Sequence, residues 1–342
     1  MSAQLVDRFG RVHRDLRISL TDKCNLRCTY CMPAEGVPWI AKQNLLTTDE
    51  IERVGRVFAS LGIDEARLTG GEPLLRPDAV DVVRRLAALP TGGGQTDGGP
   101  TDRGRMRVSM TTNALGLAGV MDDLVDAGLE RLNISIDTLD PERFHALTRR
   151  DRLDDVLAGI RAAQRSGLRP LKLNTVAMRG VNDDEFVDLV RFAREHDAQL
   201  RFIEQMPLDA GHIWSRAEMV DGREILDRLA EEFTLEPLGE RGSDPAEVFR
   251  VDGGSTTVGV IASVTAPFCG SCDRVRITAD GQLRNCLFAR DESDLLGLLR
   301  SGGSDADLAA MIRRSIGDKR EGHGIDGPNF LQPDRPMSAI GG

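Results

Sequence analysis

Lysine, tyrosine and long apolar runs are scarce in this chain of 342 residues. Only four of its 44 basic residues are lysines (Lys23, Lys42, Lys172 and Lys319), so arginine is the ordinary cation and each lysine calls for an explanation. No apolar run reaches the roughly 18 residues of a membrane-spanning helix, and the charged N-terminal segment lacks the apolar stretch of a secretion signal. We therefore expect a cytoplasmic protein that does not enter a membrane.

The charge balance excludes further classes of partner. The 54 acidic residues outnumber the 44 basic ones and give a net charge of −10. Such a balance disfavours non-specific binding to nucleic acid and to anionic membrane surfaces. We expect neither among the partners of this protein.

The six cysteines form two closely spaced groups of three. The first triplet is Cys24, Cys28 and Cys31, and the second is Cys269, Cys272 and Cys286. A three-disulfide framework is rare in a long cytoplasmic chain, and a closed structural zinc site takes four ligands where each triplet offers three. A cubane of four irons held by three thiolates leaves one iron open to a small molecule. We hypothesise two such clusters, each binding a different reactant.

Short β-rich segments alternate with longer helical ones over the first two thirds of the chain. Six βα units in series favour a parallel sheet with right-handed crossovers, two units short of a closed eight-stranded barrel. The expected strands are 16–20, 67–69, 107–111, 131–136, 171–177 and 199–203, and the expected helices are 48–61, 77–89, 118–127, 141–148, 153–166 and 184–196. The pattern predicts an α/β fold, a partial (βα)6 TIM-like barrel.

The rhythm changes after about residue 236. Segments 248–251, 258–264, 275–279 and 282–286 have the pattern of short antiparallel strands, and helices are expected over 293–300 and 305–315. We therefore predict two domains, a barrel over 1–235 and a C-terminal lobe over 236–342 that caps it. The segment 91–104, reading TGGGQTDGGPTDRG, is predicted to be a flexible inserted loop.

The first triplet lies just after the first expected strand, where a barrel enzyme keeps its active site. The spacing Cys24-x-x-x-Cys28-x-x-Cys31, with Tyr30 inside it and TGGEP over 69–73 after the second strand, closely resembles the radical S-adenosylmethionine superfamily. The resemblance implies that the open iron binds the methionyl group and that Tyr30 contacts the adenine. We also expect the carboxylate of Glu72 to complement the methionyl ammonium group.

The second triplet narrows the resemblance to one family within that superfamily. Together with RFIEQM over 201–206, DRVR over 273–276 and a terminal diglycine, it is similar to the GTP 3',8-cyclase family of molybdenum cofactor biosynthesis, over nearly the whole chain. This implies two 4Fe-4S clusters and S-adenosylmethionine as cofactors, with the second cluster meeting the guanine base. The implied S-adenosylmethionine contacts are Tyr30, Gly71, Ser135 and Met206. The implied GTP contacts are Arg17, Arg67, Thr111, Lys172, Arg274, Val275 and Arg276. The implied catalytic group is Cys24, Cys28, Cys31, Arg274, Arg276, Gly341 and Gly342.

Two features of the residues themselves agree with a bound triphosphate, and a third residue departs from the family pattern. Lys172 lies in an apolar strand of an arginine-rich chain, and a compact ammonium suits one phosphate oxygen. Arg274 and Arg276 alternate along one strand and so point to the same face. Glu65 differs, because it stands where some relatives of that family carry a basic residue.

The implied activity is a lyase reaction that converts GTP to (8S)-3',8-cyclo-7,8-dihydroguanosine 5'-triphosphate. In that family a 5'-deoxyadenosyl radical removes the ribose C3' hydrogen, and the C3' radical attacks guanine C8.

The implied partners are an external electron donor and the cyclic pyranopterin monophosphate synthase that acts next. The enzyme is expected to be a monomer or homodimer. The alternatives are a peptide-modifying radical enzyme with an auxiliary cluster and a non-catalytic zinc-binding protein.

Overall fold

A twelve-stranded sheet forms the centre of the computed structural model, which describes residues 4–92, 95–96, 99–100, 104–325, 327 and 330–341. Its middle is made of β3 (Asp15–Ser19), β4 (Glu65–Thr69), β7 (Arg107–Thr112), β8 (Leu129–Ser135), β9 (Leu171–Ala177) and β10 (Ala198–Glu204). These strands lie in the order β10-β9-β8-β7-β4-β3, and every neighbouring pair is parallel. The predicted parallel α/β sheet is confirmed.

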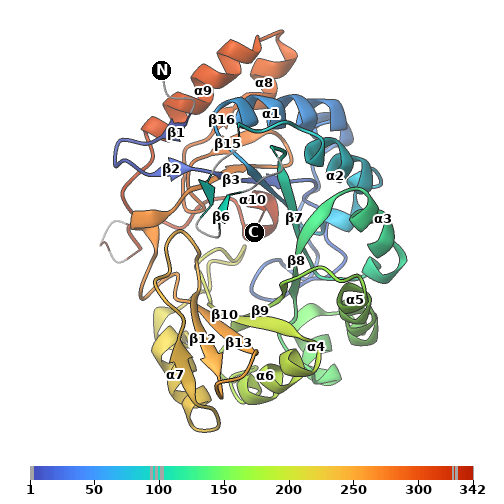
Figure 1. Ribbon diagram of the computed structural model, residues 1–342, viewed down its shortest axis with the longest axis vertical. Helices are drawn as coiled ribbons and strands as arrows, with labels where there is room; N and C mark the ends of the chain where they lie inside the picture. Colours follow the sequence, from blue (N-terminus) through green and yellow to red (C-terminus); the bar gives the residue numbers. More distant parts are fainter. Residues whose placement is uncertain are drawn as a thin grey trace.

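Helices cover the outer face of this sheet, as expected for βα units (Figure 1). They are α1 (Thr48–Ser60), α2 (Ala79–Ala87), α3 (Met121–Asp126), α4 (Pro141–Thr148), α5 (Leu153–Arg165) and α6 (Phe186–Glu195). Helix α1 shows why the sequence predicted these helices. Thr47 and Glu50 form a capping box at its start, and Ile51, Val54 and Phe58 are buried along one side.

The C-terminal part supplies two antiparallel strand pairs, as predicted. These are β12 (Glu247–Val251) with β13 (Thr257–Ile261) and β14 (Arg274–Ile277) with β15 (Gln282–Arg284). The sequence alone assigns these strands to a lobe of their own. In the structure, however, β13 also pairs in parallel with β10, and β14 pairs in parallel with β3. The C-terminal part therefore extends both edges of the barrel sheet, because strand pairing depends on distant partners that local periodicity does not identify.

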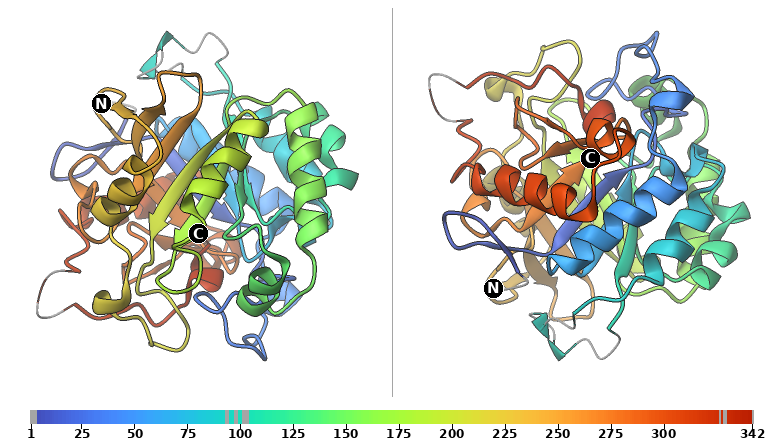
Figure 2. Two further views of the ribbon diagram at one scale, coloured as in Figure 1. Left: turned by 90° about the horizontal axis from the view of Figure 1, so that it is seen from below. Right: turned by 90° about the horizontal axis from the view of Figure 1, so that it is seen from above.

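Smaller elements complete the molecule. The described chain also contains α7 (Gly222–Ala230), α8 (Leu295–Arg300), α9 (Asp305–Gly317), α10 (Met337–Ile340), β1 (Leu5–Val6), β2 (Val12–His13), β11 (Leu235–Pro237) and β16 (Ser293–Asp294), with short 3-10 turns η1 (Lys42–Asn44), η2 (Pro73–Leu75), η3 (Leu117–Gly119), η4 (Arg216–Glu218) and η5 (Cys269–Ser271). The predicted helices α8 and α9 are confirmed, and α9 lies beside α1 (Figure 2). None of the described helices is long and apolar enough to cross a membrane.

The predicted loop at 91–104 is described only in part. Strands β5 (Gln95–Thr96) and β6 (Gly99–Pro100) pair with each other, and the backbone N–H of Thr91 donates to the carbonyl of Gly104 at 2.8 Å. Residues 93–94, 97–98 and 101–103 lie outside the described residues.

The sheet curls so that its concave face surrounds the C-terminal helix α10, which lies near the middle of the view in Figure 1. Apolar side chains between the convex face and the outer helices form a continuous core that also includes residues of α8 and α9. The polar residues that the sequence singled out lie on the opposite, concave side.

Candidate active site

The concave face encloses a cavity of about 850 Å³, which we call the central cavity. Both cysteine triplets line it, although they are more than 230 residues apart in the sequence. All six cysteines are free thiols. The fold therefore brings together two donor sets that the sequence showed only as separate motifs.

The first triplet lies on the loop that follows β3, at the carboxyl end of the parallel strands. The end of α4 holds this loop through backbone bonds from Arg27 to Thr148 (2.9 Å) and from Thr29 to Leu147 (3.0 Å). Burial raises the pKa of Cys31 to about 12 and the pKa of Cys28 well above its usual value, and the neighbouring thiols add to both shifts. These cysteines are therefore thiols at neutral pH until a metal displaces their protons.

Gly70 and Gly71 let a second loop approach the first at backbone distance. A Cβ on Gly71 would lie 2.4 Å from the carbonyl oxygen of Lys23, and one on Gly70 would lie 2.6 Å from that of Thr21. Any larger residue would separate the two loops, so glycine is required here for close approach.

Glu72, next in that loop, is held by donors of the protein itself. Its side chain is fully buried and accepts bonds from the Thr112 hydroxyl (2.7 Å) and the backbone N–H groups of Asn113 (2.7 Å) and Leu74 (3.0 Å). Burial raises its pKa to about 7. The carboxylate joins its own loop to the loop after β7, and its oxygens are occupied by the protein's own donors. Glu72 is not among the residues that line the central cavity, and its contact with a methionyl ammonium stays a prediction.

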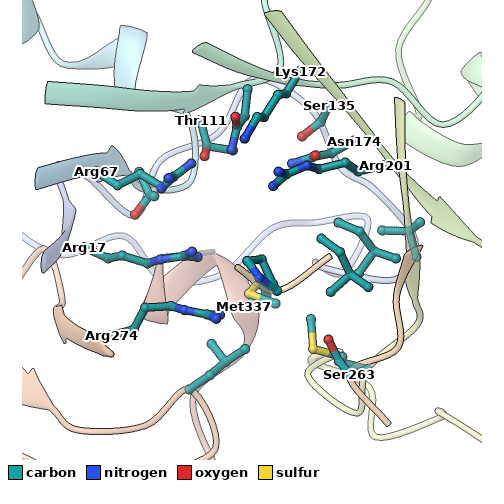
Figure 3. Close-up of a pocket in the computed structure, with 18 of the residues that line it drawn as sticks. Arg17, Arg67, Thr111, Ser135, Lys172, Asn174, Arg201, Ser263, Arg274 and Met337 are labelled. Atoms are coloured by element: carbon teal, nitrogen blue, oxygen red, sulfur yellow. The ribbon is translucent and has the colours of Figure 1, made fainter. Parts of the chain in front are cut away.

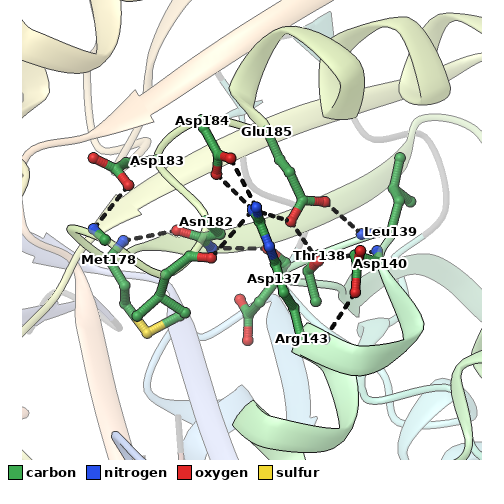
Figure 4. Close-up of polar contacts among 12 residues, drawn as sticks. Asp137, Thr138, Leu139, Asp140, Arg143, Met178, Asn182, Asp183, Asp184 and Glu185 are labelled. Atoms are coloured by element: carbon green, nitrogen blue, oxygen red, sulfur yellow. Dashed lines mark hydrogen bonds and ion pairs between the residues drawn. The ribbon is translucent and has the colours of Figure 1, made fainter.

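Tyr30 reaches across to the loop after β8. Its hydroxyl donates to Asp137 at 2.8 Å, and Asp137 also accepts from the backbone N–H of Val176 at 2.9 Å. Burial raises the pKa of Asp137 to about 6. A polar network behind this loop fixes its position (Figure 4). In it, Asn182 donates to the Asp137 carbonyl at 2.7 Å, and Glu185 accepts from Thr138 at 2.6 Å and from the backbone of Leu139 at 2.9 Å.

The second triplet surrounds β14. Cys269 begins η5, Cys272 lies two residues before β14, and Cys286 lies two residues after β15. Burial raises the pKa of Cys269. Burial acts the same way on Cys272, but the positive charges of Arg274 and Lys319 outweigh it and leave the pKa of Cys272 below its usual value. The two triplets thus have different electrostatic surroundings.

In-register strand pairing arranges the cations of the central cavity in layers. Arg276, Arg17 and Arg67 are direct neighbours across β14, β3 and β4, so their side chains leave the sheet on the same face. Arg17, Arg67 and Arg274 point into the cavity from one side, and Lys172 and Arg201 point into it from the other (Figure 3). The next layer down contains two carboxylates, Asp15 and Glu65, in register with Arg274 and Arg107.

Three arginines surround Glu65, the residue that differed from the expected pattern. It is 3.1 Å from Arg67, 3.3 Å from Arg107 and 3.5 Å from Arg131. Arg107 and Arg131 also line the central cavity, and the sequence did not single them out. Three positive charges therefore lie within 3.5 Å of the Glu65 carboxylate.

Several polar atoms of this layer lack a hydrogen-bond partner within the described part of the chain. Buried examples are Nε of Arg17, Arg67 and Arg107. Burial lowers the pKa of Lys172 to about 7, and the nearby charge of Arg201 adds to the effect. Buried donors and crowded positive charges of this kind are costly in an empty site and suit an anionic ligand with several oxygens.

Most of the predicted site residues line the central cavity. These are the six cysteines, Arg17, Tyr30, Arg67, Gly71, Thr111, Ser135, Lys172, Met206, Arg274 and Arg276. Val275 does not, because alternation along β14 turns its fully buried side chain to the other face of the sheet. Its side chain therefore faces away from the cavity, and the predicted GTP contact of Val275 would have to use its backbone. Four more lining residues, Arg107, Arg131, Asn174 and Arg201, were not named as site residues from the sequence, although Arg201 begins the RFIEQM motif. Single arginines carry little signal in this arginine-rich chain.

The C-terminal tail enters the molecule beside the cations. The Gly341 carbonyl accepts a bond from Arg276 at 3.0 Å, and a Cβ on Gly341 would lie 2.7 Å from that of Ser19. Met337 and Ser338 line the central cavity. The other predicted tail residue, Gly342, lies outside the described residues.

The donor sets suit iron–sulfur clusters. Within the described residues, no three Cys, His, Asp or Glu side chains gather as the ligands of one metal ion do. In a cubane each thiolate binds a different iron, so its cysteines need not meet at one point. The arrangement can hold a thiolate-bound cluster at each end of a cationic chamber.

Comparisons with known proteins agree with this geometry. Residues 18–193 match the family model of the radical SAM superfamily, and residues 198–325 match that of molybdenum cofactor synthesis, C-terminal part. A GTP 3',8-cyclase of Streptomyces coelicolor is 55% identical, covering 99% of this chain and 96% of that protein. One of Corynebacterium glutamicum is 51% identical, covering 99% and 89% respectively.

Solved structures show the same fold at low identity. The native anSMEcpe structure with bound AdoMet has a TM-score of 0.59 at 14% identity, and it covers 91% of this chain and 82% of that one. The structure of Streptococcus suis SuiB also has a TM-score of 0.59 at 14% identity, covering 95% and 77%. At such identities the likeness concerns the fold alone, the partial barrel that the sequence predicted.

Proposed function

This chain belongs to the GTP 3',8-cyclase family of the radical S-adenosylmethionine superfamily, and on that premise we propose that its central cavity binds GTP beside S-adenosylmethionine. The activity is that of a lyase that forms 3',8-cyclo-7,8-dihydroGTP, the first step of molybdenum cofactor biosynthesis. The family requires S-adenosylmethionine and a 4Fe-4S cluster.

In this proposal the first triplet holds that cluster. The S-adenosylmethionine contacts are Tyr30, Gly71, Ser135 and Met206, all of which line the cavity near the carboxyl ends of the strands. Gly71 supports the assignment because its loop lies against the backbone of the cysteine loop, where a ligand of the open iron would also touch it. Asp137 orients Tyr30 through the 2.8 Å bond between the carboxylate and the phenol.

The cationic layer binds the triphosphate. GTP carries about four negative charges near neutral pH, and several converging cations are needed to hold them. Arg17, Arg67, Thr111, Lys172, Arg274 and Arg276 are the proposed contacts from the sequence, and Arg107, Arg131 and Arg201 are added by their position in the same cavity.

The second triplet holds a second 4Fe-4S cluster in this proposal, whose open iron meets the guanine base. Cys269, Cys272 and Cys286 reach the same cavity as the first triplet, which supports their action on one substrate. We also propose that the terminal residues Gly341 and Gly342 take part in catalysis from within the cavity. The hydrogen bond from Arg276 to the Gly341 carbonyl supports this role.

When bound, the first cluster and S-adenosylmethionine supply the radical chemistry of the family. The residues of this chain bind, orient and shield the reactants. Strand β14, which pairs with β3, and the tail, which bonds to Arg276, would shield the reactants from water on the side of the second triplet. The in-register cations fix the triphosphate and thereby the ribose relative to the first cluster.

The remaining partners follow from the same proposal. An external electron donor must reduce the first cluster, and a cyclic pyranopterin monophosphate synthase would consume the product. A cytoplasmic location supplies GTP and keeps the cysteines reduced.

One observation carries the proposal: the two cysteine triplets share one cation-lined cavity. The test is anaerobic reconstitution with iron and sulfide, followed by incubation with reductant, S-adenosylmethionine and GTP, and mass analysis of the products. We expect 5'-deoxyadenosine together with a cyclised nucleotide.

The matched variant replaces Cys269, Cys272 and Cys286 by Ala. It should retain one cluster and uncoupled cleavage of S-adenosylmethionine, and it should form no cyclised nucleotide. Cyclisation at the natural rate by this variant would contradict the role of the second triplet.

A further inference from the structure

Lys319 is a buried lysine beside the second triplet, in a chain that uses arginine almost everywhere. It lies two residues after the end of α9, and it is 3% exposed. Its Nζ donates to the Arg274 carbonyl at 2.8 Å and lies 3.4 Å from the carbonyl oxygen and 3.6 Å from the Sγ of Cys272. The three protons of the ammonium are thus directed at two backbone oxygens and one cysteine sulfur.

Lys319 is unusual in which groups balance its positive charge. Across the described chain, no carboxylate lies within ion-pair distance of its Nζ, whereas Arg11 and Arg274 are close enough to repel it. The groups that favour its charge are Cys272 and Cys286 in their thiolate form. A buried cation without an anionic partner costs several kcal/mol, so the sulfur atoms have to supply the negative charge.

Arg11, from the turn before β2, provides a contrast. Asp7 neutralises it at 2.6 Å, and its other donors go to the carbonyls of Cys269 (2.6 Å), Arg320 (2.7 Å) and Glu321 (2.9 Å). Arg11 therefore holds the shape of the loop around Lys319 while its own charge is paired with Asp7. Lys319 differs from Arg11 in that it donates to a cysteine sulfur and has no carboxylate partner within the described residues.

We propose that Lys319 is the positioning residue of the second cluster, donating a hydrogen bond to the Cys272 sulfur and raising the reduction potential of that cluster. This rests on the proposed function, because it requires the second triplet to hold a cluster. A nearby positive charge and an N–H···S bond stabilise the more negative, reduced state of a thiolate-bound cluster. Lysine suits the position because a compact ammonium reaches both carbonyls and the sulfur, where a planar guanidinium would need more room.

The test uses full-length chains in which Cys24, Cys28 and Cys31 are Ala, so that only the second cluster contributes to the signal. The probe is the midpoint potential of the reconstituted cluster, measured by a redox titration followed by electron paramagnetic resonance. The variants are Lys319→Met, Lys319→Arg and the control Lys42→Met, which removes an exposed lysine of η1.

We expect Lys319→Met to lower the midpoint potential, Lys319→Arg to restore part of the difference, and Lys42→Met to leave the potential unchanged. An equal potential in Lys319→Met and the parent would overturn the inference. If Lys319→Met fails to load iron, recovery of loading by Lys319→Arg supports the role of the charge, and failure of both variants to load overturns it in favour of a packing role.

Iron content separates this inference from the proposed function. The natural chain should contain about eight irons after reconstitution, four for each cluster. A value of about four, with none in the Cys24, Cys28 and Cys31 variant, would overturn the second cluster and the inference together. A value of about eight with no effect of Lys319 on the potential would overturn the inference alone.

Discussion

At the scale of single residues, burial decides the protonation of the cavity. Lys172 has a pKa of about 7, lowered from the ordinary 10.5 first by burial and then by Arg201. In the absence of a ligand, this amine therefore loses its proton far more readily near neutral pH than an exposed lysine does. A triphosphate nearby favours the ammonium form, so binding raises the pKa of Lys172 and takes up a proton.

This coupling predicts a pH dependence of GTP binding. Affinity should fall as pH rises from about 7 to 9, by at most roughly tenfold per pH unit, because binding must protonate Lys172. Lys172→Arg stays charged throughout this range, so its affinity should change little with pH. Calorimetry in buffers with different ionisation heats measures both affinity and proton uptake.

The control for Lys172 is Lys42→Arg, which alters an exposed lysine and should keep the natural pH profile. An affinity of the natural protein that is constant from pH 7 to 9, with no proton taken up on binding, would exclude Lys172 from the triphosphate site.

The sequence identified site residues best where their residue type is rare in this chain. Lys172 and the cysteines were visible because they are rare in this chain. Arg131 and Arg201 were not, since one arginine among 40 carries no signal until the register shows which face it occupies. The partners of Glu72 were not visible in the sequence, because two donors to its carboxylate, Thr112 and Asn113, come from a loop about 40 residues away.

At the scale of elements, the C-terminal tail depends on a glycine that has almost no space around it. Gly341 has a φ of +88°, and a Cβ there would lie 2.7 Å from the Cβ of Ser19 and 2.8 Å from Oγ1 of Thr69. Gly302, after α8, has the same φ of +88°, but a Cβ there would meet nothing within 4 Å. The two positions share the same positive φ, and only Gly341 adds a steric conflict.

Alanine at these two glycines should therefore have different effects. Gly302→Ala should lower stability by about 1 kcal/mol, the usual cost of this backbone region, and should keep cyclisation near the natural rate. Gly341→Ala should displace the tail, break its bond to Arg276 and reduce cyclisation by roughly tenfold or more. Product formation by mass analysis, with thermal unfolding as the measure of stability, checks both. Equal rates in the two variants would show that the tail is not needed in place.

Elements with strong local signals were predicted well. The six central strands and their helices follow from alternation, amphipathic spacing and capping residues such as Thr47. The parallel pairing of β13 and β14 did not follow, because it joins segments more than 50 and 250 residues apart along the chain. Nothing local distinguishes a strand that stays in a hairpin from one that also extends a sheet.

At the scale of the whole molecule, this pairing makes the two parts of the chain dependent on each other. β10 and β3 are the outermost strands that 1–235 contributes to the parallel sheet, and β13 and β14 cover them. Salt bridges on the outside add to this dependence, since Arg53 pairs with Asp305 at 2.8 Å and Arg300 with Glu50 at 2.8 Å. A barrel part cut from the rest would expose two unpaired sheet edges.

Fragment 1–235 alone should therefore aggregate, because open edges of a parallel sheet pair with other chains. Co-expression of fragment 236–342 should restore a soluble one-to-one complex, since β13 and β14 would again cover β10 and β3. Size-exclusion chromatography with light scattering measures both outcomes.

A monomeric 1–235 fragment that unfolds cooperatively would instead support two independent domains. In that case the cysteine triplets would belong to separately folding units, and the central cavity would form only when those units dock.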